Sequence, residues 1–441
     1  MSDYDVIVIG TGIAGGSIGA QCAAAGLKVA VTDSLPYGGT CAQRGCDPKK
    51  VLLAASEAVS RAQALAGHGL EGEPRIVWGD LIRRKREFVD GVPLRTEARL
   101  VDAGATLLHG EARFAGPDKL LIDGKRLQAD IVAIATGAMS RPLGICGEEF
   151  LLHADGFMDL EELPPRIVFV GGGYISFEFA ALARRAGSEV TILQRSSRVL
   201  KGFDPDLAAL LVERYRSLGI KVLLDTPTLQ VCRQGDAFAV ETPTGSLAAD
   251  LVVHGAGRVP DLARLDLAAG GVRAGDRGVV VDAQLRSVSN RRVFAAGDAA
   301  AVGAPLTPPA SRQADVVVKT ILGQKADYDP RATASVAFGD PPLAAVGITA
   351  AEAESRDDVE VVSHDMSNWF TTRRLGFTHA AAKVMRETAT GRLLGAHVLG
   401  VNAEEVINVF ALAVRQGLTA DQVAESVWAY PTSSSDIGYL V

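Results

Sequence analysis

The fold follows from residues 3–33, which read DYDVIVIGTGIAGGSIGAQCAAAGLKVAVTD. The apolar run predicts a buried strand, and a glycine turn, a helical segment and a second apolar strand come after it. Gly10, Gly12 and Gly15 form GxGxxG, which permits a tight turn, close backbone approach to a pyrophosphate and close helix–strand packing. Asp33 closes the second strand, where a carboxylate binds ribose hydroxyls. Together these features predict a dinucleotide-binding unit rather than a glycine-rich turn without function.

The same pattern recurs at residues 166–195, which read RIVFVGGGYISFEFAALARRAGSEVTILQR. Gly171 and Gly173 hold the first two glycine positions, and Ser176, which is still small, holds the third. The chain therefore contains two nucleotide-binding units. Two different nucleotide sites indicate two cofactors.

The second unit ends without an acid. Gln194 stands where Asp33 closes the first unit, and Arg195, Arg198 and Lys201 follow it. An acid at this point repels a 2′-phosphate, whereas an arginine binds it through two N–H groups. We therefore expect NADPH rather than NADH. The alternative is that these cations only hydrate a surface loop.

Two further apolar strands end in small residues. ADIVAIATGA at 129–138 ends in a turn that contains Thr136 and Gly137, and NRRVFAAGDAA at 290–300 places Asp298 after a strand. A carboxylate in that position suits a chain of sugar-like hydroxyls such as the ribityl group of a flavin. Either stretch alone is a weak indication of a flavin site. The order of the two stretches and the two glycine motifs along the chain makes the indication specific.

Composition narrows the class of protein. The 441 residues predict about two to four domains, and 48% hydrophobic with 22% charged residues indicates a large soluble core. The net charge of −7 argues against a nucleic-acid partner. The basic run RRKRE at 83–87 is interpreted as a solvated helix face. We recognise no leader and no membrane-spanning stretch, so we expect a cytoplasmic protein without a membrane partner.

The cysteines fall into two groups. Five cysteines are too few for a secreted disulfide scaffold, and Cys22, Cys146 and Cys232 stand alone and are interpreted as packing residues. For Cys41 and Cys46, in GGTCAQRGC at 38–46, packing, a structural disulfide, a metal pair and a redox pair all remain open. A zinc site needs about four ligands. Neither the other cysteines nor the seven histidines have that spacing, so we predict no metal site.

These motifs together resemble the flavoprotein disulfide reductases of the pyridine nucleotide-disulfide oxidoreductase type, such as glutathione reductase, dihydrolipoamide dehydrogenase and mercuric reductase. The resemblance covers nearly the whole chain. Its motifs are GxGxxG at 10–15, GGTCAQRGCDPKK at 38–50, ATG at 135–137, GGGYISFE at 171–178, GAGRVPD at 255–261, FAAGD at 294–298 and DPPLAAVGIT at 340–349.

The resemblance implies functional residues in each part of the chain. The expected FAD-binding residues are Gly10, Gly12, Gly15, Asp33, Gly39, Thr40, Thr136, Gly137 and Asp298. The expected NAD(P)H-binding residues are Gly171, Gly173, Tyr174, Arg195, Lys201 and Gly257. The expected catalytic residues are Cys41, Cys46, Lys49, Glu178 and Tyr430. Among them, Lys49 would lie near flavin N5 and pair with Glu178, and Tyr174 would cover the nicotinamide pocket.

The resemblance also favours the redox reading of the two cysteines. Cys46 would lie next to the flavin and Cys41 would be the interchange thiol, in a disulfide that receives electrons from NAD(P)H through FAD. The reduced pair needs a stabilised thiolate, because the thiolate and not the thiol is the nucleophile. Lys49, three residues after Cys46, and a helix that begins near Pro48 would both favour that thiolate.

The C-terminal stretch SVWAYPTSSSDIGYLV at 426–441 departs from the disulfide-reducing members. Those members carry a His that protonates the leaving thiolate, and Tyr430 stands in its place. A tyrosine pKa near 10 makes a poor proton donor at neutral pH. A thiolate-bound metal ion needs no such donor, and mercuric reductase also has a tyrosine here, but no C-terminal cysteine pair follows Cys232. The alternative is that Tyr430 packs the interface and lines a site for another acceptor.

We therefore predict an α/β fold with two Rossmann-like, doubly wound, three-layer nucleotide-binding domains and a C-terminal α+β dimerisation domain. The predicted domains are the first FAD-binding part at 1–150, the NAD(P)H-binding domain at 151–257, the second FAD-binding part at 258–330 and the interface domain of a homodimer at 331–441. The predicted enzyme passes electrons from NADPH through FAD and Cys41–Cys46 to a small molecule or a thiolate-bound metal ion. The alternatives are a disulfide or persulfide reductase and a redox-sensing flavoprotein with little turnover.

Overall fold

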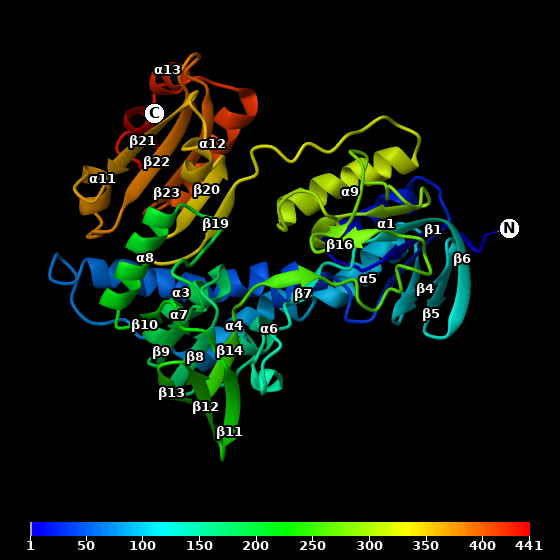
Figure 1. Cartoon of the computed structure of the whole chain (residues 1–441), viewed down its shortest axis with the longest axis horizontal. Coiled ribbons are helices and arrows are strands. Elements are labelled where there is room, and N and C mark those ends of the chain that lie inside the picture. The colour runs from blue at the N-terminus through cyan, green and yellow to red at the C-terminus, as the bar shows by residue number, and fades with distance from the viewer. Residues whose placement is uncertain (1) are drawn as a thin grey trace. The chain divides into compact units, whose positions relative to one another are not determined.

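The computed structural model describes residues 2–441, which divide into two units (Figure 1). Unit 1 contains the chain up to Lys50 together with Arg83–Arg141 and Arg258–Pro330. Unit 2 contains Val51–Ile82, Pro142–Gly257 and Arg331–Val441. Helices α3 (Cys46–Ala64) and α4 (Trp78–Val89) cross the division.

Within the described part of unit 1, a seven-stranded sheet carries a parallel ladder in the order β3-β2-β1-β6-β18. This order is that of a dinucleotide-binding fold. The elements of unit 1 are β1 (Tyr4–Ile9), α1 (Ile13–Ala24), β2 (Val29–Asp33), α2 (Gly39–Arg44), α5 (Val92–Asp102), β3 (Thr106–His109), β4 (Ala112–Gly116), β5 (Lys119–Ile122), β6 (Lys125–Ile134), β7 (Ala138–Ser140), β15 (Arg258–Pro260), β16 (Ala274–Gly275), β17 (Gly278–Val279), β18 (Val293–Ala295), η2 (Gly297–Ala299) and α9 (Thr307–Ile321).

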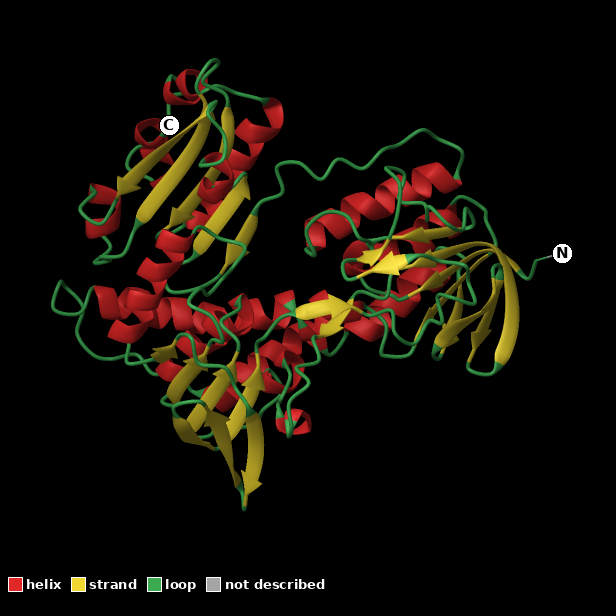
Figure 2. Cartoon of the chain, viewed as in Figure 1, coloured by secondary structure: helices red, strands yellow, loops and turns green. Residues whose placement is uncertain are grey.

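Both faces of this sheet are buried. Val6 and Val8 of β1 belong to one apolar cluster, whereas the alternate residues Ile7 and Ile9 belong to another. Helices α1 and α9 pack against each other and contribute Ile18 and other residues to the first cluster (Figures 1 and 2). Because side chains of a strand point alternately to opposite faces, a strand covered on both sides is apolar throughout. This explains the unbroken apolar run from which the fold was predicted.

The predicted NAD(P)H-binding part of unit 2 repeats this arrangement in a parallel sheet of order β10-β9-β8-β14. Its core contains aromatic side chains, among them Phe157 and Phe179, whose rings stack with centroids 4.5 Å apart. The elements are η1 (Glu148–Phe150), α6 (Ala154–Phe157), β8 (Arg166–Val170), α7 (Tyr174–Arg185), β9 (Glu189–Leu193), α8 (Pro205–Ser217), β10 (Lys221–Leu223), β11 (Gln230–Gln234), β12 (Ala237–Thr242), β13 (Gly245–Ala249) and β14 (Leu251–His254).

Residues 331–441 form an antiparallel sheet of order β19-β20-β23-β22-β21. Helix α12 packs on β20 and β23, and Val406, Ile407 and Phe410 are buried on its inner face. The elements are β19 (Ser335–Ala337), β20 (Leu343–Gly347), α10 (Ala350–Ala353), β21 (Val359–Asp365), α11 (Phe370–Arg373), β22 (Ala381–Glu387), β23 (Leu393–Leu399), α12 (Ala403–Gln416), α13 (Ala420–Ala424), η3 (Ser433–Asp436) and α14 (Ile437–Leu440).

The predicted fold class is thus confirmed, with corrections at single residues. Cys22 is buried as predicted, but Cys146 is exposed and Cys232 is half-buried, so burial in packing does not account for these two thiols. In the basic run, Lys85 is only 2% exposed because it lies on the inner face of α4. No helix within residues 2–441 is both long and apolar enough to cross a membrane.

Candidate active site

In unit 1, the strands of the parallel ladder end at one edge of the sheet. β1 runs into Gly10, β2 ends in Asp33, β6 runs into Thr136 and Gly137, and β18 precedes Asp298. Ligands of open α/β sheets bind outside the carboxyl ends of the strands. The predicted FAD residues of these four strands therefore share the edge at which a dinucleotide binds.

The glycine turn leaves one opening. Gly10 has φ +102°, and a Cβ there would overlap the carbonyl oxygen of Ala135. A Cβ on Gly15 would overlap the carbonyl oxygen of Gly10. By contrast, the nearest atom to a Cβ on Gly12 would be the Cα of Gly39 at 3.8 Å. Gly10 and Gly15 are thus required by the fold, whereas Gly12 leaves space for a ligand.

Polar groups at this edge fit FAD. The hydroxyl of Thr136 is buried and has no hydrogen-bond partner among residues 2–441. The pKa of Asp298 lies above its ordinary value, because burial raises it more than the charge of Arg258 lowers it. These groups suit the hydroxyls of a sugar-like chain. Thr40 lies half-buried in α2, directly after Gly39, whose Cα borders the space at Gly12.

Asp33 also has a task within the protein. Its Oδ2 accepts hydrogen bonds from the backbone N–H of Thr11 at 2.8 Å and from the Thr11 hydroxyl at 2.6 Å. That hydroxyl accepts a hydrogen bond from the N–H of Gly38 at 3.1 Å. Asp33 therefore holds the glycine turn, and through Thr11 it holds the start of the segment that carries the cysteines.

Cys41 and Cys46 lie at a helix break in unit 1. Cys41 is part of α2, and Cys46 is the first residue of α3. Thr307, the first residue of α9, donates a hydrogen bond from its Oγ1 to the Sγ of Cys41 at 3.0 Å. The same oxygen lies 3.8 Å from the Sγ of Cys46. One hydroxyl thus contacts both sulfurs.

The environment places the negative charge of the reduced pair on Cys46. A hydrogen bond from Cys41 lowers the pKa of the Cys46 thiol to about 6, with further lowering by Thr307 and Lys49, against burial and Asp47. The hydrogen bond to Cys46 and burial raise the pKa of Cys41. The N-terminal end of α3 also favours a thiolate. Near neutral pH the pair is therefore a Cys41 thiol and a Cys46 thiolate.

In unit 2, the side chains of Ser176 and Gln194 hold the second glycine turn. Gly15 and Asp33 occupy the corresponding positions in unit 1. Ser176 occupies the position of the third glycine. Its hydroxyl donates a hydrogen bond to the carbonyl of Gly171 at 2.5 Å. Gln194 accepts a hydrogen bond from the N–H of Gly172 at 2.9 Å and donates to the carbonyl of Arg198 at 2.7 Å. Gly257, three residues after β14 ends at His254, has φ +102°.

The remaining predicted NAD(P)H residues surround this turn. Gly173 caps α7, and Tyr174, the first residue of that helix, is 42% exposed. Arg195 and Lys201 follow β9 and are exposed. Two cations are therefore accessible next to the turn, where a 2′-phosphate would bind.

Two predicted catalytic residues lie in unit 2. Glu178 of α7 is 1% exposed, and its Oε1 accepts a hydrogen bond from the N–H of Phe338 at 2.9 Å. Tyr430 is 76% exposed on the single chain. Because Lys49 belongs to unit 1, its pairing with Glu178 stays a prediction.

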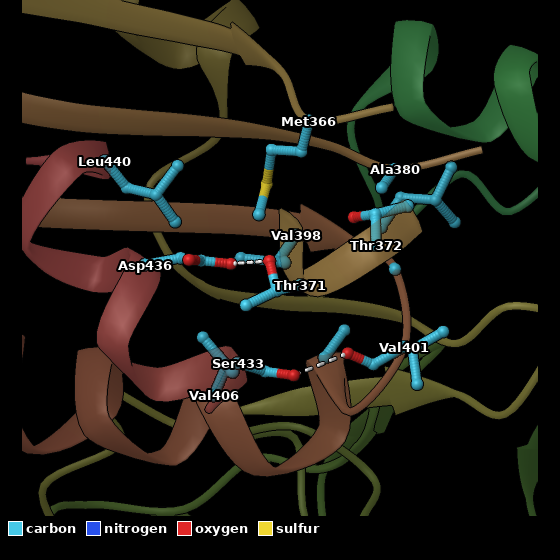
Figure 3. Close-up of a pocket in the computed structure, with 13 residues that line it drawn as sticks. Met366, Thr371, Thr372, Ala380, Val398, Val401, Val406, Ser433, Asp436 and Leu440 are labelled. Carbon is cyan, nitrogen blue, oxygen red and sulfur yellow. Dashed lines mark hydrogen bonds between the residues drawn. The ribbon is translucent and has the colours of Figure 1, made fainter. Parts of the chain in front are cut away.

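The sequence reasoning missed Thr307, Thr11 and the structural role of Gln194. Thr307 lies more than 250 residues from the cysteines, and a Thr before two prolines reads only as a helix start. A small pocket in the C-terminal segment, residues 331–441, is lined by Met366, Thr371, Asp436 and their neighbours and is not part of the cysteine site (Figure 3).

Two dinucleotide-binding edges and a thiol pair define a class of protein in which a nicotinamide cofactor supplies electrons to cysteines. Residues 4–314 match the family model described as Pyridine nucleotide-disulphide oxidoreductase, and residues 333–440 match the dimerisation domain of the same family. The chain belongs to the pyridine nucleotide-disulphide oxidoreductases. Members of this family bind FAD and use NAD(P)H, and the dimerisation domain supports a homodimer.

Individual relatives span several activities. The chain is 30% identical to glutathione reductase of Burkholderia cepacia over 98% of this chain and 97% of that protein. It is 29% identical to mercuric reductase of Bacillus cereus over 100% of this chain and 71% of that protein. The solved Cu(II) complex of the HOCl-induced flavoprotein disulfide reductase RclA from Escherichia coli has a TM-score of 0.88 and 27% identity, covering 100% of this chain and 99% of that one.

Proposed function

We propose that this protein is an NADPH-dependent flavoprotein oxidoreductase whose Cys41–Cys46 pair passes two electrons to a soft metal ion. The observation that carries the proposal is the paired environment of the two sulfurs, in which Cys46 has a lowered pKa and Thr307 contacts both. Bound FAD would supply the two-electron chemistry that links NADPH to the cysteines. The fit of the unit 1 edge to FAD supports this assignment.

The chemistry of the cysteines balances with one proton. Two electrons and one proton break the Cys41–Cys46 disulfide and leave a thiol at Cys41 and a thiolate at Cys46. Thr307 and the charge of Lys49 stabilise that thiolate. When the electrons leave for an acceptor, the sulfur–sulfur bond forms again and the proton is released.

A metal acceptor is favoured by the C-terminal segment. Tyr430 replaces the histidine that protonates a leaving thiolate, and a metal ion on two thiolates needs no such proton. Soft ions prefer thiolates. One Hg(II) ion would take both electrons, and two Cu(II) ions would take one each. The similarity to a protein solved as a Cu(II) complex supports copper as an acceptor to test.

Disulfide or persulfide reduction is the second candidate. The relative at 30% identity is a glutathione reductase, which favours this reaction. Tyr430 or water would then supply the proton. A redox sensor with little turnover is the remaining alternative, and it would consume NADPH once and stop.

An anaerobic titration of the holoenzyme with NADPH tests the electron path. We expect a long-wavelength thiolate–flavin absorption band that is absent in Cys46→Ser and unchanged in Cys146→Ser, the matched control at an exposed cysteine outside the site. Hg(II), Cu(II) and glutathione disulfide are then added separately, with NADH run in parallel.

Reoxidation by a metal ion but not by glutathione disulfide supports the proposal, and the reverse result supports the second candidate. Full acceptor turnover in Cys46→Ser would show that the pair is not the electron carrier. Equal turnover with NADH and NADPH would contradict the assigned nucleotide preference.

A further inference from the structure

A buried carboxylate in the C-terminal segment connects three helices of unit 2. Asp340, in the loop between β19 and β20, is 7% exposed. Its Oδ1 accepts a hydrogen bond from the Ser60 hydroxyl of α3 at 2.5 Å, and its Oδ2 accepts from Arg214 of α8 at 3.0 Å. Oδ2 also forms an ion pair with Arg185 of α7. The loop is thus held by charge-assisted bonds, which are the stronger kind.

The same loop holds Glu178. Phe338, two residues before Asp340, donates its N–H to the Glu178 carboxylate at 2.9 Å. Glu178 and Arg185 are seven residues apart on α7 and therefore share one face of the helix. Loop residues 338–340 are thus held to that face at two points. Phe338 bonds to Glu178, and Asp340 pairs with Arg185.

The redox helix joins this network. Arg185 donates a second hydrogen bond to the hydroxyl of Ser56 at 3.1 Å. Ser56 and Ser60 are four residues apart on α3, the helix that begins with Cys46. One small pocket is lined by all four residues Ser56, Glu178, Arg185 and Asp340.

The network depends on the charge of Asp340. Burial raises the pKa of this carboxyl, but Arg185, Arg214 and Ser60 together hold the pKa below its ordinary value. The Arg185 side chain is 3% exposed. Removal of the carboxylate charge would leave a buried guanidinium without its counter-ion, and such a change releases the groups held by the pair.

We propose that Asp340 is a positioning residue for Glu178: it fixes the loop whose Phe338 N–H orients the Glu178 carboxylate. This inference rests on the proposed function, in which NADPH reduces bound FAD, and on the expectation that Glu178 acts in that step through its pairing with Lys49. It assigns a part in the reductive half of the reaction to a residue of the C-terminal segment.

The test measures flavin reduction in holoenzyme by anaerobic stopped flow at saturating NADPH, per bound FAD and below the melting temperature of each variant. Misplacement by about 1 Å can cost about 100-fold in rate, so we expect Asp340→Asn to slow flavin reduction by about 10- to 100-fold. Ser60→Ala, which removes one bond of the network, should slow it less.

Two comparisons separate positioning from a general loss of stability. The double variant Asp340→Asn with Glu178→Gln should be no slower than Glu178→Gln alone, because both changes remove one function. Asp358→Asn is the matched control, since Asp358 forms a surface ion pair with Arg356 in the same segment. It should retain the wild-type rate.

A wild-type rate of flavin reduction in Asp340→Asn would overturn the inference. So would a double variant that is slower than Glu178→Gln alone. If Asp340→Asn does not retain FAD, the same comparison is made with Ser60→Ala. A wild-type rate in Ser60→Ala, or a double variant with Glu178→Gln that is slower than Glu178→Gln alone, would then overturn the inference. A wild-type protein that NADPH cannot reduce would overturn the proposed function, and the inference with it.

Discussion

At the scale of single residues, the two sulfurs differ because their neighbours differ. Cys41 donates to Cys46, and Thr307 and Lys49 both favour the thiolate on Cys46. Burial opposes any charge there, and Asp47 adds repulsion. The favourable contacts exceed these costs, because the net shift of the Cys46 pKa is downward. The negative charge of the reduced pair is therefore assigned to Cys46, and Cys41 keeps its proton.

The thiolate–flavin band of the reduced enzyme should depend on pH with a midpoint of about 6. The pKa of Cys46 lies below its ordinary value of 9.0, so the thiolate persists above the midpoint and is protonated as the pH falls through it. Thr307→Val removes a hydrogen bond to the sulfurs and should raise the midpoint, whereas Thr307→Ser should keep it. Absorbance against pH measures both.

The control for this titration is Thr320→Val in the same helix, α9. Its hydroxyl donates to the carbonyl of Val316 at 2.8 Å, away from the sulfurs. The midpoint should not move in this variant. A Thr307→Val enzyme with the wild-type midpoint would contradict the role of the hydroxyl.

At the scale of elements, both glycine turns are held by a side chain from the second strand, but the residue type differs between the two units. In unit 1, Asp33 accepts from the N–H of Thr11, and in unit 2 Gln194 accepts from the N–H of Gly172. Each side chain comes from the end of the second strand and holds the turn after the first. The neutral Gln194 performs this task without a negative charge, which leaves the second turn compatible with a 2′-phosphate.

Gly12→Ala and Gly15→Ala should have different effects. A methyl group on Gly12 has space within the protein but would occupy the approach to a pyrophosphate, so FAD affinity should fall while the melting temperature of the apoprotein stays near wild type. A methyl group on Gly15 would overlap the Gly10 carbonyl, so that apoprotein should melt lower by about 4 °C or more. Calorimetry and FAD titration measure these effects.

Each glycine variant serves as the control for the other. Equal losses of apoprotein stability in both variants would contradict the distinction between fold and ligand. So would undiminished FAD binding in Gly12→Ala.

At the scale of the whole molecule, the C-terminal segment exposes apolar side chains. Val427 is fully exposed, at 101%, and Tyr430 and Tyr439 are 76% and 72% exposed. All three lie in the part of the chain that matches the dimerisation domain. Large apolar groups that are exposed in one segment indicate a surface that another protein covers. A second copy of this chain is the expected partner.

Val427→Asp should weaken the dimer, because it would bury a charge at the subunit interface. We expect a monomer by size-exclusion chromatography with light scattering. Acceptor turnover should fall by about 10-fold or more if Tyr430 acts on the partner subunit's cysteines, while flavin reduction by NADPH should persist.

Val288→Asp, which changes a 41% exposed valine in unit 1, is the control and should remain a dimer. A Val427→Asp protein that stays dimeric would place the interface elsewhere. A monomer with wild-type acceptor turnover would show that Tyr430 does not act between subunits.

Local patterns in the chain were enough for the fold class, both nucleotide units and the Cys41–Cys46 motif. Apolar strand runs, glycine spacing and a helix start are properties of neighbouring residues, so they can be read without knowledge of distant contacts. The contacts of Thr307 with the sulfurs and of Asp340 with three helices could not be read this way. These partners lie far apart in the chain and meet only after folding, when burial makes each hydrogen bond and charge pair specific.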